Sequence, residues 1–257
     1  MMFSGEKDFR DKYKEWYKAS GTRFSTRSYL EKALEKQHRD KLSLLIKNIN
    51  ALDEGITIKE TYSSEKGMFE SFGFTKLKNV PAFAVILTDG STHAFEKAGF
   101  YGEALCLEMT ALGIKSCWVS GSIKKQNLKD YINIEKGKKF LTSIAFGYGD
   151  DKSLKEVEAI RKRKTLDKIF EGEELSGSLK KIIECARNAP SAINRQPWKY
   201  ELKDNMLYLK NPLVKGGPFP AELDIGISML HVSAAASAHG ISSVWEESKG
   251  YFGEFKL

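Results

Sequence analysis

Two stretches of this chain repeat one another at an offset of 127 residues, and this repeat limits the folds that the chain can adopt. Each stretch is a helix rich in small residues, then a glycine, then a strand that carries tryptophan. Glycine after a helix is common, so two unrelated helix–glycine–strand units are the alternative. The pairs in register are Gly99 with Gly226, Ala111 with Ala238, Gly113 with Gly240, Ile114 with Ile241, Ser116 with Ser243, and Trp118 with Trp245. This register favours a duplication, in which two halves too small to bury their own sheets pack together like a fused homodimer.

Length and composition indicate a globular chain with no membrane-spanning segment. The 257 residues are 41% apolar and 29% charged, as in ordinary globular proteins. A membrane-spanning helix needs about 20 apolar residues, whereas the longest apolar run, Val80 to Leu87, has eight. The first 14 residues are charged without an apolar core, so no secretory signal is expected. Three scattered cysteines suit a reducing compartment, and we expect a cytoplasmic protein.

The net charge of +7 favours anionic partners without indicating a nucleic-acid-binding surface. The chain has 41 lysines and arginines against 34 acidic residues, and the cations are spread evenly between the acids. The only dense basic run is Arg161 to Lys164, whereas a nucleic-acid-binding protein usually carries a basic stripe with interleaved aromatic residues. Phosphates and nucleotides are therefore the expected partners. The histidines and cysteines have no spacing that suits a metal site.

Hydrophobic periodicity predicts helices mixed with strands, hence an α+β protein. Helices are expected at 7–19, from about Ser28, and at 40–52, 93–112, 124–131, 166–171, 174–189 and 223–239. Strands are expected at 56–62, 80–87, 115–120, 140–146, 198–203, 206–210 and 241–245. The intervening segments are a break at 20–22, a loop at 63–79, a charged linker at 151–164 and a Pro/Gly-rich loop at 211–220. The expected halves are residues 1–150 and 151–257, each with a mostly antiparallel sheet covered by helices.

Residues 186–198 carry the pattern with the clearest chemical meaning, Ala-Arg-Asn-Ala-Pro-Ser-Ala-Ile-Asn-Arg-Gln-Pro-Trp. Pro190 ends the preceding helix, so Ser191 and Asn194 are expected in a loop that is neither helix nor sheet. A hydroxyl and an amide in such a loop can recognise a flat heterocycle with a polar edge. The alternative is an ordinary helix-to-strand connection built from residues that favour turns.

A second candidate site is Arg23-x-Ser25-x-Arg27, at the expected beginning of a helix. Helix N-terminal amides and the forked guanidinium groups both favour an anion, so this pattern predicts a phosphate site. Arginines that only solvate the surface are the alternative. A third feature is Ser120-Gly121 at the end of a predicted strand, where bare backbone can approach a ligand closely.

Together these features resemble the nitroreductase family of FMN-dependent oxidoreductases, in particular the branch in which one chain contains both halves of the usual dimer. The specific match is Ala189-Pro190-Ser191-Ala192-x-Asn194-x-Gln196-Pro197-Trp198, and Arg23-x-Ser25-x-Arg27 resembles the opening motif of the family. The segments Leu112–Gly121 and Phe146–Tyr148 resemble later family segments. The resemblance implies a nitroreductase-like α+β fold, in which two homologous halves form an internal pseudo-dimer.

The resemblance also implies a cofactor and a reaction. NAD(P)H would pass a hydride through flavin N5 to a small nitroaromatic- or quinone-like acceptor by a ping-pong mechanism, with the flavin carrying the chemistry. No side chain is expected as a catalytic acid or base; Arg195 and Lys76 are candidates for a cation near the flavin ring. Because the dimer is internal, the chain can be a monomer. The residues implied to bind FMN are Arg23, Phe24, Ser25, Arg27, Val119, Ser120, Gly121, Arg161, Arg163, Pro190, Ser191, Ala192 and Asn194.

One FMN per chain is expected, because only the second half contains the complete loop. The corresponding stretch of the first half, Leu52 to Lys59, has no proline, no tryptophan and two acids. The opening motif of the second half is reduced to Arg163-Lys164-Thr165. Two other functions stay open. A flavin-binding carrier or sensor without efficient turnover would carry the same motifs, and a basic nucleic-acid-binding domain would show steeply salt-dependent binding.

Overall fold

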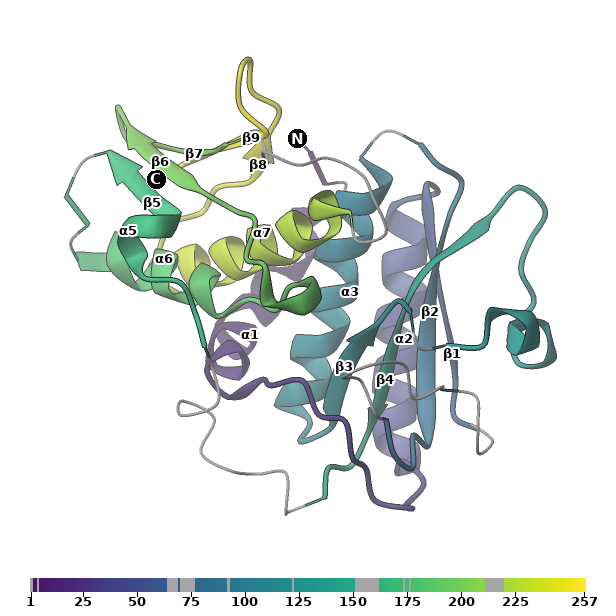
Figure 1. Cartoon of the computed structure of the whole chain (residues 1–257). Coiled ribbons are helices and arrows are strands. Elements are labelled where there is room, and N and C mark those ends of the chain that lie inside the picture. Colours follow the sequence, from purple (N-terminus) through teal and green to yellow (C-terminus); the bar gives the residue numbers. More distant parts are fainter. Residues whose placement is uncertain are drawn as a thin grey trace. The chain divides into compact units, whose positions relative to one another are not determined.

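A computed structural model describes residues 2–3, 5–63, 69, 77–91, 93–121, 123–150, 162–172, 174–175, 177–210 and 220–257 (Figure 1). The chain separates into two compact units. Unit 1 contains Met1–Gly21, Phe95–Ala104 and Arg161–Leu257, and unit 2 contains Thr22–Ala94 and Leu105–Ile160. Each unit has one mostly antiparallel sheet accompanied by helices, which confirms the expected α+β class. No helix in the described residues is long and apolar enough to cross a membrane.

Unit 2 contains a four-stranded antiparallel sheet. Its elements are α2 (Lys36–Leu52), β1 (Ile56–Thr61), β2 (Ala82–Thr88), β3 (Lys115–Val119), η2 (Lys125–Asp130) and β4 (Lys139–Gly147). The strand order is β1-β2-β4-β3, and β2 is buried along its whole length, as its continuous apolar run predicts. The side-chain amide of Asn50 in α2 exchanges two hydrogen bonds of 2.8 Å with the backbone of Ile58. Asn50 therefore satisfies backbone groups on edge strand β1.

Unit 1 contains a five-stranded sheet with the order β5-β6-β7-β9-β8, in which only the β5–β6 pair is parallel. Helix α3 (Ala94–Ala111) contributes its residues 95–104 to this unit. The other elements are η1 (Glu6–Phe9), α1 (Arg10–Thr22), α5 (Leu166–Ile169), β5 (Phe170–Gly172), α6 (Gly177–Asn188), η4 (Ala192–Asn194), β6 (Tyr200–Lys203), β7 (Met206–Leu209), α7 (Ala221–Ala238), β8 (Trp245–Glu246) and β9 (Gly253–Lys256).

The same order of helices and strands occurs twice along the chain. The first series is α2-β1-β2-α3-β3-β4 and the second is α6-β6-β7-α7-β8-β9. Corresponding strands occupy corresponding places, β1-β2-β4-β3 in one sheet and β6-β7-β9-β8 in the other, and all of these pairings are antiparallel. This correspondence supports the duplication. The division into homologous halves at residue 150 stays a prediction.

Helices α3 and α7 approach each other within unit 1 at two glycines. A Cβ atom added to Gly99 would overlap the carbonyl oxygen of Leu223, and one added to Gly226 would overlap that of Glu96. The two contacts are equivalent, because adding the 127-residue offset to Gly99 and Glu96 gives Gly226 and Leu223. Contacts exchanged in this way are typical of a two-fold interface.

Both helices also end in the same way. The N–H of Ile114 donates to the carbonyl of Met109 at 2.8 Å, and the N–H of Ile241 donates to that of Ala236 at 2.9 Å. Gly113 and Gly240 have φ angles of 76° and 85°, a left-handed conformation that glycine adopts without strain. The glycines predicted to end these helices do so.

Glu6 ties the N-terminal segment to the rest of unit 1. The fully buried carboxylate accepts hydrogen bonds from the Ser233 hydroxyl at 2.7 Å and from the Trp245 N–H at 3.0 Å. Burial raises the pKa of Glu6 to about 7, although these hydrogen bonds and the charge of Arg10 lower it. The N–H of Met2 also donates to the Trp245 carbonyl at 2.8 Å. Residues 1–21 therefore belong to the same compact unit as the C-terminal part of the chain.

Several details of the sequence prediction are wrong. The helix expected from about Ser28 is absent, because tertiary hydrogen bonds hold this segment extended: the Tyr29 hydroxyl donates to the carbonyls of Thr26 and Ala145. Helix α1 continues through the break expected at 20–22, and α2 begins at Lys36. Strands β5 and β9 were not predicted, and β8 has only two residues. Most of the loops expected at 63–79 and 211–220, and of the linker at 151–164, lies outside the described residues.

The raised pKa of Glu6 predicts a pH-dependent stability. Because its folded pKa of about 7 exceeds the ordinary value of 4.5, its contribution is complete below about pH 4.5 and is lost as the pH rises through about 7. The loss amounts to as much as about 3 kcal/mol. Glu6→Gln mimics the protonated carboxyl, so its free energy of unfolding in urea should fall less than that of the wild type between about pH 5 and about pH 8.

The control for this experiment is Glu15→Gln, which removes an exposed carboxylate from α1. It should keep the pH dependence of the wild type. If Glu6→Gln and Glu15→Gln show the same pH dependence, Glu6 is not the titrating group.

Candidate functional site

The loop between α6 and β6 has an unusual backbone. Ile193, Asn194 and Gln196 have φ angles of 47°, 58° and 48°, in the left-handed region. Asparagine tolerates this conformation, but it is strained for the β-branched Ile193, whose side chain is 78% exposed. Strained conformations of this kind cost about 1–3 kcal/mol and persist only where the surroundings impose them.

Hydrogen bonds within the loop and from α7 impose this shape. The Ser191 hydroxyl accepts the N–H of Gln196 at 2.9 Å. From the first turn of α7, the buried carboxylate of Asp224 accepts the N–H of Ala192 at 2.9 Å and pairs with Arg195 at 3.1 Å. Burial raises the pKa of Asp224 to about 6, while the bonds to Ala192 and Arg195 lower it. Arg195, expected near a flavin, thus pairs with Asp224.

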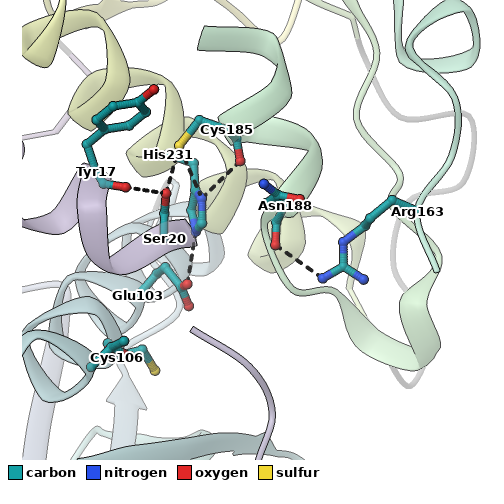
Figure 2. Close-up of polar contacts among 9 residues, drawn as sticks. Tyr17, Ser20, Glu103, Cys106, Arg163, Cys185, Asn188 and His231 are labelled. Carbon is teal, nitrogen blue, oxygen red and sulfur yellow. Dashed lines mark hydrogen bonds and ion pairs between the residues drawn. The ribbon is translucent and has the colours of Figure 1, made fainter. Parts of the chain in front are cut away.

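Residues 162–164 hold the other side of the loop. The guanidinium of Arg163 donates to the side-chain oxygen of Asn194 at 2.9 Å and to the carbonyl of Asn188 at 3.1 Å (Figure 2 shows the latter). Asn194 donates to the carbonyl of Lys162 at 2.7 Å, and Gln196 accepts the N–H of Lys164 at 2.8 Å. The polar side chains of the sequence motif therefore form the hydrogen bonds that stabilise the loop conformation.

In unit 2, the segment from Arg23 to Arg27 runs beside β3 in an extended conformation. Ser25 forms a parallel bridge with Ser116, and the N–H of Thr26 donates to the Ser116 carbonyl at 3.0 Å. No helix begins here, so the expected contribution of helix N-terminal amides to a phosphate site is wrong. Strand β3 is at the edge of its sheet, which leaves room for this additional bridged segment.

The opening motif nevertheless gathers cationic and hydroxyl donors around Cys117 of β3. Burial raises the pKa of the Cys117 thiol, whereas the charges of Arg27 and Arg23 and a hydrogen bond with Ser25 lower it. Ser25 therefore lies beside β3, and both guanidinium groups are close enough to Cys117 for their charges to act on it. Arg23 is buried, and the exposed Arg27 forms no ion pair with any described residue. Two guanidinium groups and a hydroxyl are a donor set that suits a phosphate dianion.

The end of β3 carries the third predicted feature. Val119 is buried, and its carbonyl accepts a hydrogen bond of 2.5 Å from the Ser143 hydroxyl. The Ser120 side chain lies 2.9 Å from the Thr142 hydroxyl, so it is directed into unit 2. Gly121 is exposed and has no atom within 4 Å of the place where a Cβ would stand. The backbone at Gly121 is therefore open to close approach.

The first half has no counterpart of the loop. Between α2 and β1 the connection is three residues, Asp53 to Gly55, whereas eleven residues, 189–199, connect α6 with β6. Asp53 is buried and accepts the N–H of Gly55 at 2.8 Å, which closes a tight turn. Of the other expected site residues, Arg161 and Lys76 lie outside the described residues.

A buried network in unit 1 was not predicted from the sequence (Figure 2). Nε2 of His231 lies 3.0 Å from Glu103, and Nδ1 lies 3.1 Å from the Cys185 carbonyl and 3.7 Å from its sulfur. The carbonyl can only accept, so Nδ1 carries a proton and cannot deprotonate the thiol. Ser20 donates to the Tyr17 carbonyl and accepts from the thiol at 3.2 Å. The network joins α1, α3, α6 and α7, and is not a nucleophilic site.

No local pattern could reveal this network, since His231 is 46 residues from Cys185 and 128 from Glu103. His231 is fully buried, and both of its ring nitrogens lie within hydrogen-bond distance of a partner. Among the described residues, no group of three or more His, Cys, Asp or Glu could hold a metal ion.

The chain thus combines repeated α+β sheets, a polar loop held by its own hydrogen bonds, and arginine and serine side chains beside β3. The model of the family described as "Putative TM nitroreductase" matches residues 15–236. The chain therefore belongs to this nitroreductase family.

Solved structures were compared with this chain as well. A Thermotoga maritima protein described as a "putative nitroreductase" is 21% identical, with a TM-score of 0.64 over 94% of this chain and 93% of that one. The FMN-dependent nitroreductase NfnB of Mycobacterium smegmatis, solved with NADPH, is 16% identical, with a TM-score of 0.46 over 60% of this chain and 96% of its own. A search of curated protein sequences finds no match. The Thermotoga structure supports the nitroreductase-like fold over nearly the whole chain.

The buried network predicts how substitutions at Glu103 affect stability. Glu103→Ala leaves His231 without its partner inside the protein, and we expect the free energy of unfolding to fall by about 3 kcal/mol or more. Glu103→Gln can donate its amide proton to Nε2 of a neutral imidazole, so its loss should be about 1 kcal/mol or less. Urea unfolding of both variants measures the difference. Equal losses would show that the hydrogen bond between residue 103 and His231 does not account for the difference in stability.

Proposed function

We propose that this chain is an FMN-dependent oxidoreductase that transfers a hydride from NAD(P)H to a small nitroaromatic- or quinone-like acceptor. The observation that carries the proposal is the family match, which spans residues 15–236 and so includes both sequence motifs. The chemistry of the donors near β3 supports it independently, because they suit the phosphate of FMN. When bound, FMN supplies the hydride chemistry.

The side chains of the opening motif would hold the phosphate and the ribityl chain. Arg23 and Arg27 provide two cations, and Ser25 provides a hydroxyl. Phe24 is the remaining candidate in this segment, and Arg161 would add a further cation. The contact of Arg163 with the phosphate stays a prediction, since its terminal nitrogens bond to Asn194 of the loop and to the Asn188 carbonyl of α6.

The loop and the end of β3 would orient the ring. Pro190, Ser191, Ala192 and Asn194 would meet the cofactor, and the hydrogen bonds that hold this loop would reduce the ordering cost of binding. The Ser191 hydroxyl accepts one hydrogen bond within the loop and keeps its own proton to donate. Backbone groups from Val119 to Gly121 would approach the polar edge of the ring. None of these residues needs to act as an acid or a base.

We further propose that the chain is an internal pseudo-dimer with one FMN. The repeated element order and the exchanged glycine contacts of α3 and α7 support the duplication. The three-residue turn between α2 and β1 supports a single site, since it leaves no second loop. Because an internal pair replaces two subunits, the chain would act as a monomer.

The visible spectrum of the purified protein tests the cofactor. After incubation with FMN and desalting, we expect flavin absorbance at about 450 nm and one FMN per chain. Addition of NADH or NADPH without oxygen should bleach this absorbance, and reciprocal plots against an added quinone should be parallel, as ping-pong kinetics require.

Each other outcome of that experiment has a definite meaning. Two FMN molecules per chain would exclude the single-site proposal while keeping the cofactor. Retained FMN that neither nicotinamide reduces would indicate a carrier or sensor. Failure to retain FMN at any concentration would overturn the proposed function.

Arg27→Ala tests the assignment of the phosphate site. Loss of a charge-assisted hydrogen bond should weaken FMN binding by about tenfold or more, while riboflavin, which lacks the phosphate, should bind as tightly as to the wild type. Quenching of flavin fluorescence measures both dissociation constants. Arg39→Ala is the matched control, because it removes an exposed arginine from α2 in the same unit. Equal weakening of FMN and riboflavin would show that Arg27 does not act on the phosphate.

A further inference from the structure

Both oxygens of the Asp224 carboxylate bond to the loop that precedes β6. One oxygen accepts the N–H of Ala192 at 2.9 Å, and the other pairs with Arg195 at 3.1 Å. The side chain of Asp224 is 1% exposed, whereas that of Arg195 is 30% exposed. A buried carboxylate is costly unless charged or polar groups compensate it. The loop provides both compensating groups, so Asp224 and the loop depend on each other.

The two partners of Asp224 flank two of the three loop residues with left-handed φ angles. Ala192 and Arg195 enclose Ile193 and Asn194, which both have left-handed φ angles. A chain segment relaxes from such a conformation unless its ends are held. The α7 carboxylate holds both ends at once, since it bonds to the backbone on one side and to a side chain on the other.

The repeat offers a comparison within the same chain. The 127-residue offset that relates Gly99 to Gly226 places Lys97 at the position of Asp224. The half with the loop therefore has a carboxylate in the first turn of its long helix. The half with the three-residue turn has a cation there, which could not accept a backbone N–H. The acid and the loop occur together.

We propose that Asp224 is a positioning residue for FMN: it holds residues 191–195 in the conformation that meets the cofactor, without touching the cofactor itself. This inference rests on the proposed function. It predicts that FMN affinity depends on Asp224 even though α7 contributes none of the expected ligands. Asp224 acts through Ala192 and Arg195. The more of these two bonds a replacement side chain keeps, the smaller its effect on FMN affinity should be.

The experiment compares Asp224→Ala, Asp224→Asn and the control Glu222→Gln, which removes another carboxylate from the same turn of α7. The measured quantities are the dissociation constant of FMN and the rate of tryptic cleavage after Arg195 in the protein without FMN. Cleavage after Lys203, in the turn between β6 and β7, is the internal reference. Urea unfolding identifies any variant that does not fold.

The proposal expects graded effects. Asp224→Ala should weaken FMN binding by about tenfold or more and speed cleavage after Arg195 several-fold relative to cleavage after Lys203. Asp224→Asn keeps an acceptor for the Ala192 N–H but loses the ion pair, so both quantities should be intermediate. Glu222→Gln should match the wild type. Asp224→Asn is also the milder change, and its result stands if Asp224→Ala does not fold.

Other results separate this inference from the proposed function. Unchanged FMN binding by Asp224→Ala or Asp224→Asn, while the wild type binds FMN, would overturn only the role of Asp224. Absence of FMN binding by the wild type would overturn the proposed function and this inference with it. Weakened binding with an unchanged rate of cleavage after Arg195 would contradict action through the loop.

Discussion

The backbone-to-backbone contact of α3 and α7 is the constraint on which the organisation of unit 1 depends. Gly99 and Gly226 allow the two helices to approach until each meets a carbonyl oxygen of the other, so no side chain fits at either position. This contact sets the position of α7 against α3. Helix α7 is buried along most of its length. Asp224 of this helix holds one side of the loop, and Ser233 of the same helix bonds to Glu6 of the N-terminal segment.

Three buried carboxyl groups gather along α7. Asp224 lies in the first turn of α7 and bonds to the loop. Glu103 of α3 bonds to His231 of α7, and Glu6 accepts a hydrogen bond from the hydroxyl of Ser233, in the second half of α7. Burial raises the pKa of Asp224 and Glu6 toward neutrality, because desolvation outweighs their hydrogen bonds. Buried carboxyl groups with specific hydrogen-bond partners therefore stabilise unit 1 together with hydrophobic packing. Removal of one partner leaves a polar group inside the protein.

The sequence predicted most elements because their patterns are local. The small-residue helices, their terminal glycines and the buried run of β2 all have local signals, and the structure contains them. The helix expected from Ser28 failed because Tyr29 bonds to Ala145, a residue 116 positions away. Strand β5 has three residues, too few to show a period. For the site, the motif residues were identifiable, but Asp224 and Glu103 were not, since their partners are distant in sequence.

The short turn from Asp53 to Gly55 has a consequence for how such a chain can change. In a symmetric homodimer every substitution appears at both sites, so no position can be altered for one site alone. In a chain where only one half has the loop, the equivalent place in the other half has no ligand to hold. Lys97 stands where the other half needs an acid, and Asp53 closes a turn where the other half opens a loop. The two copies can therefore diverge at these positions, because a substitution in one half is not repeated in the other.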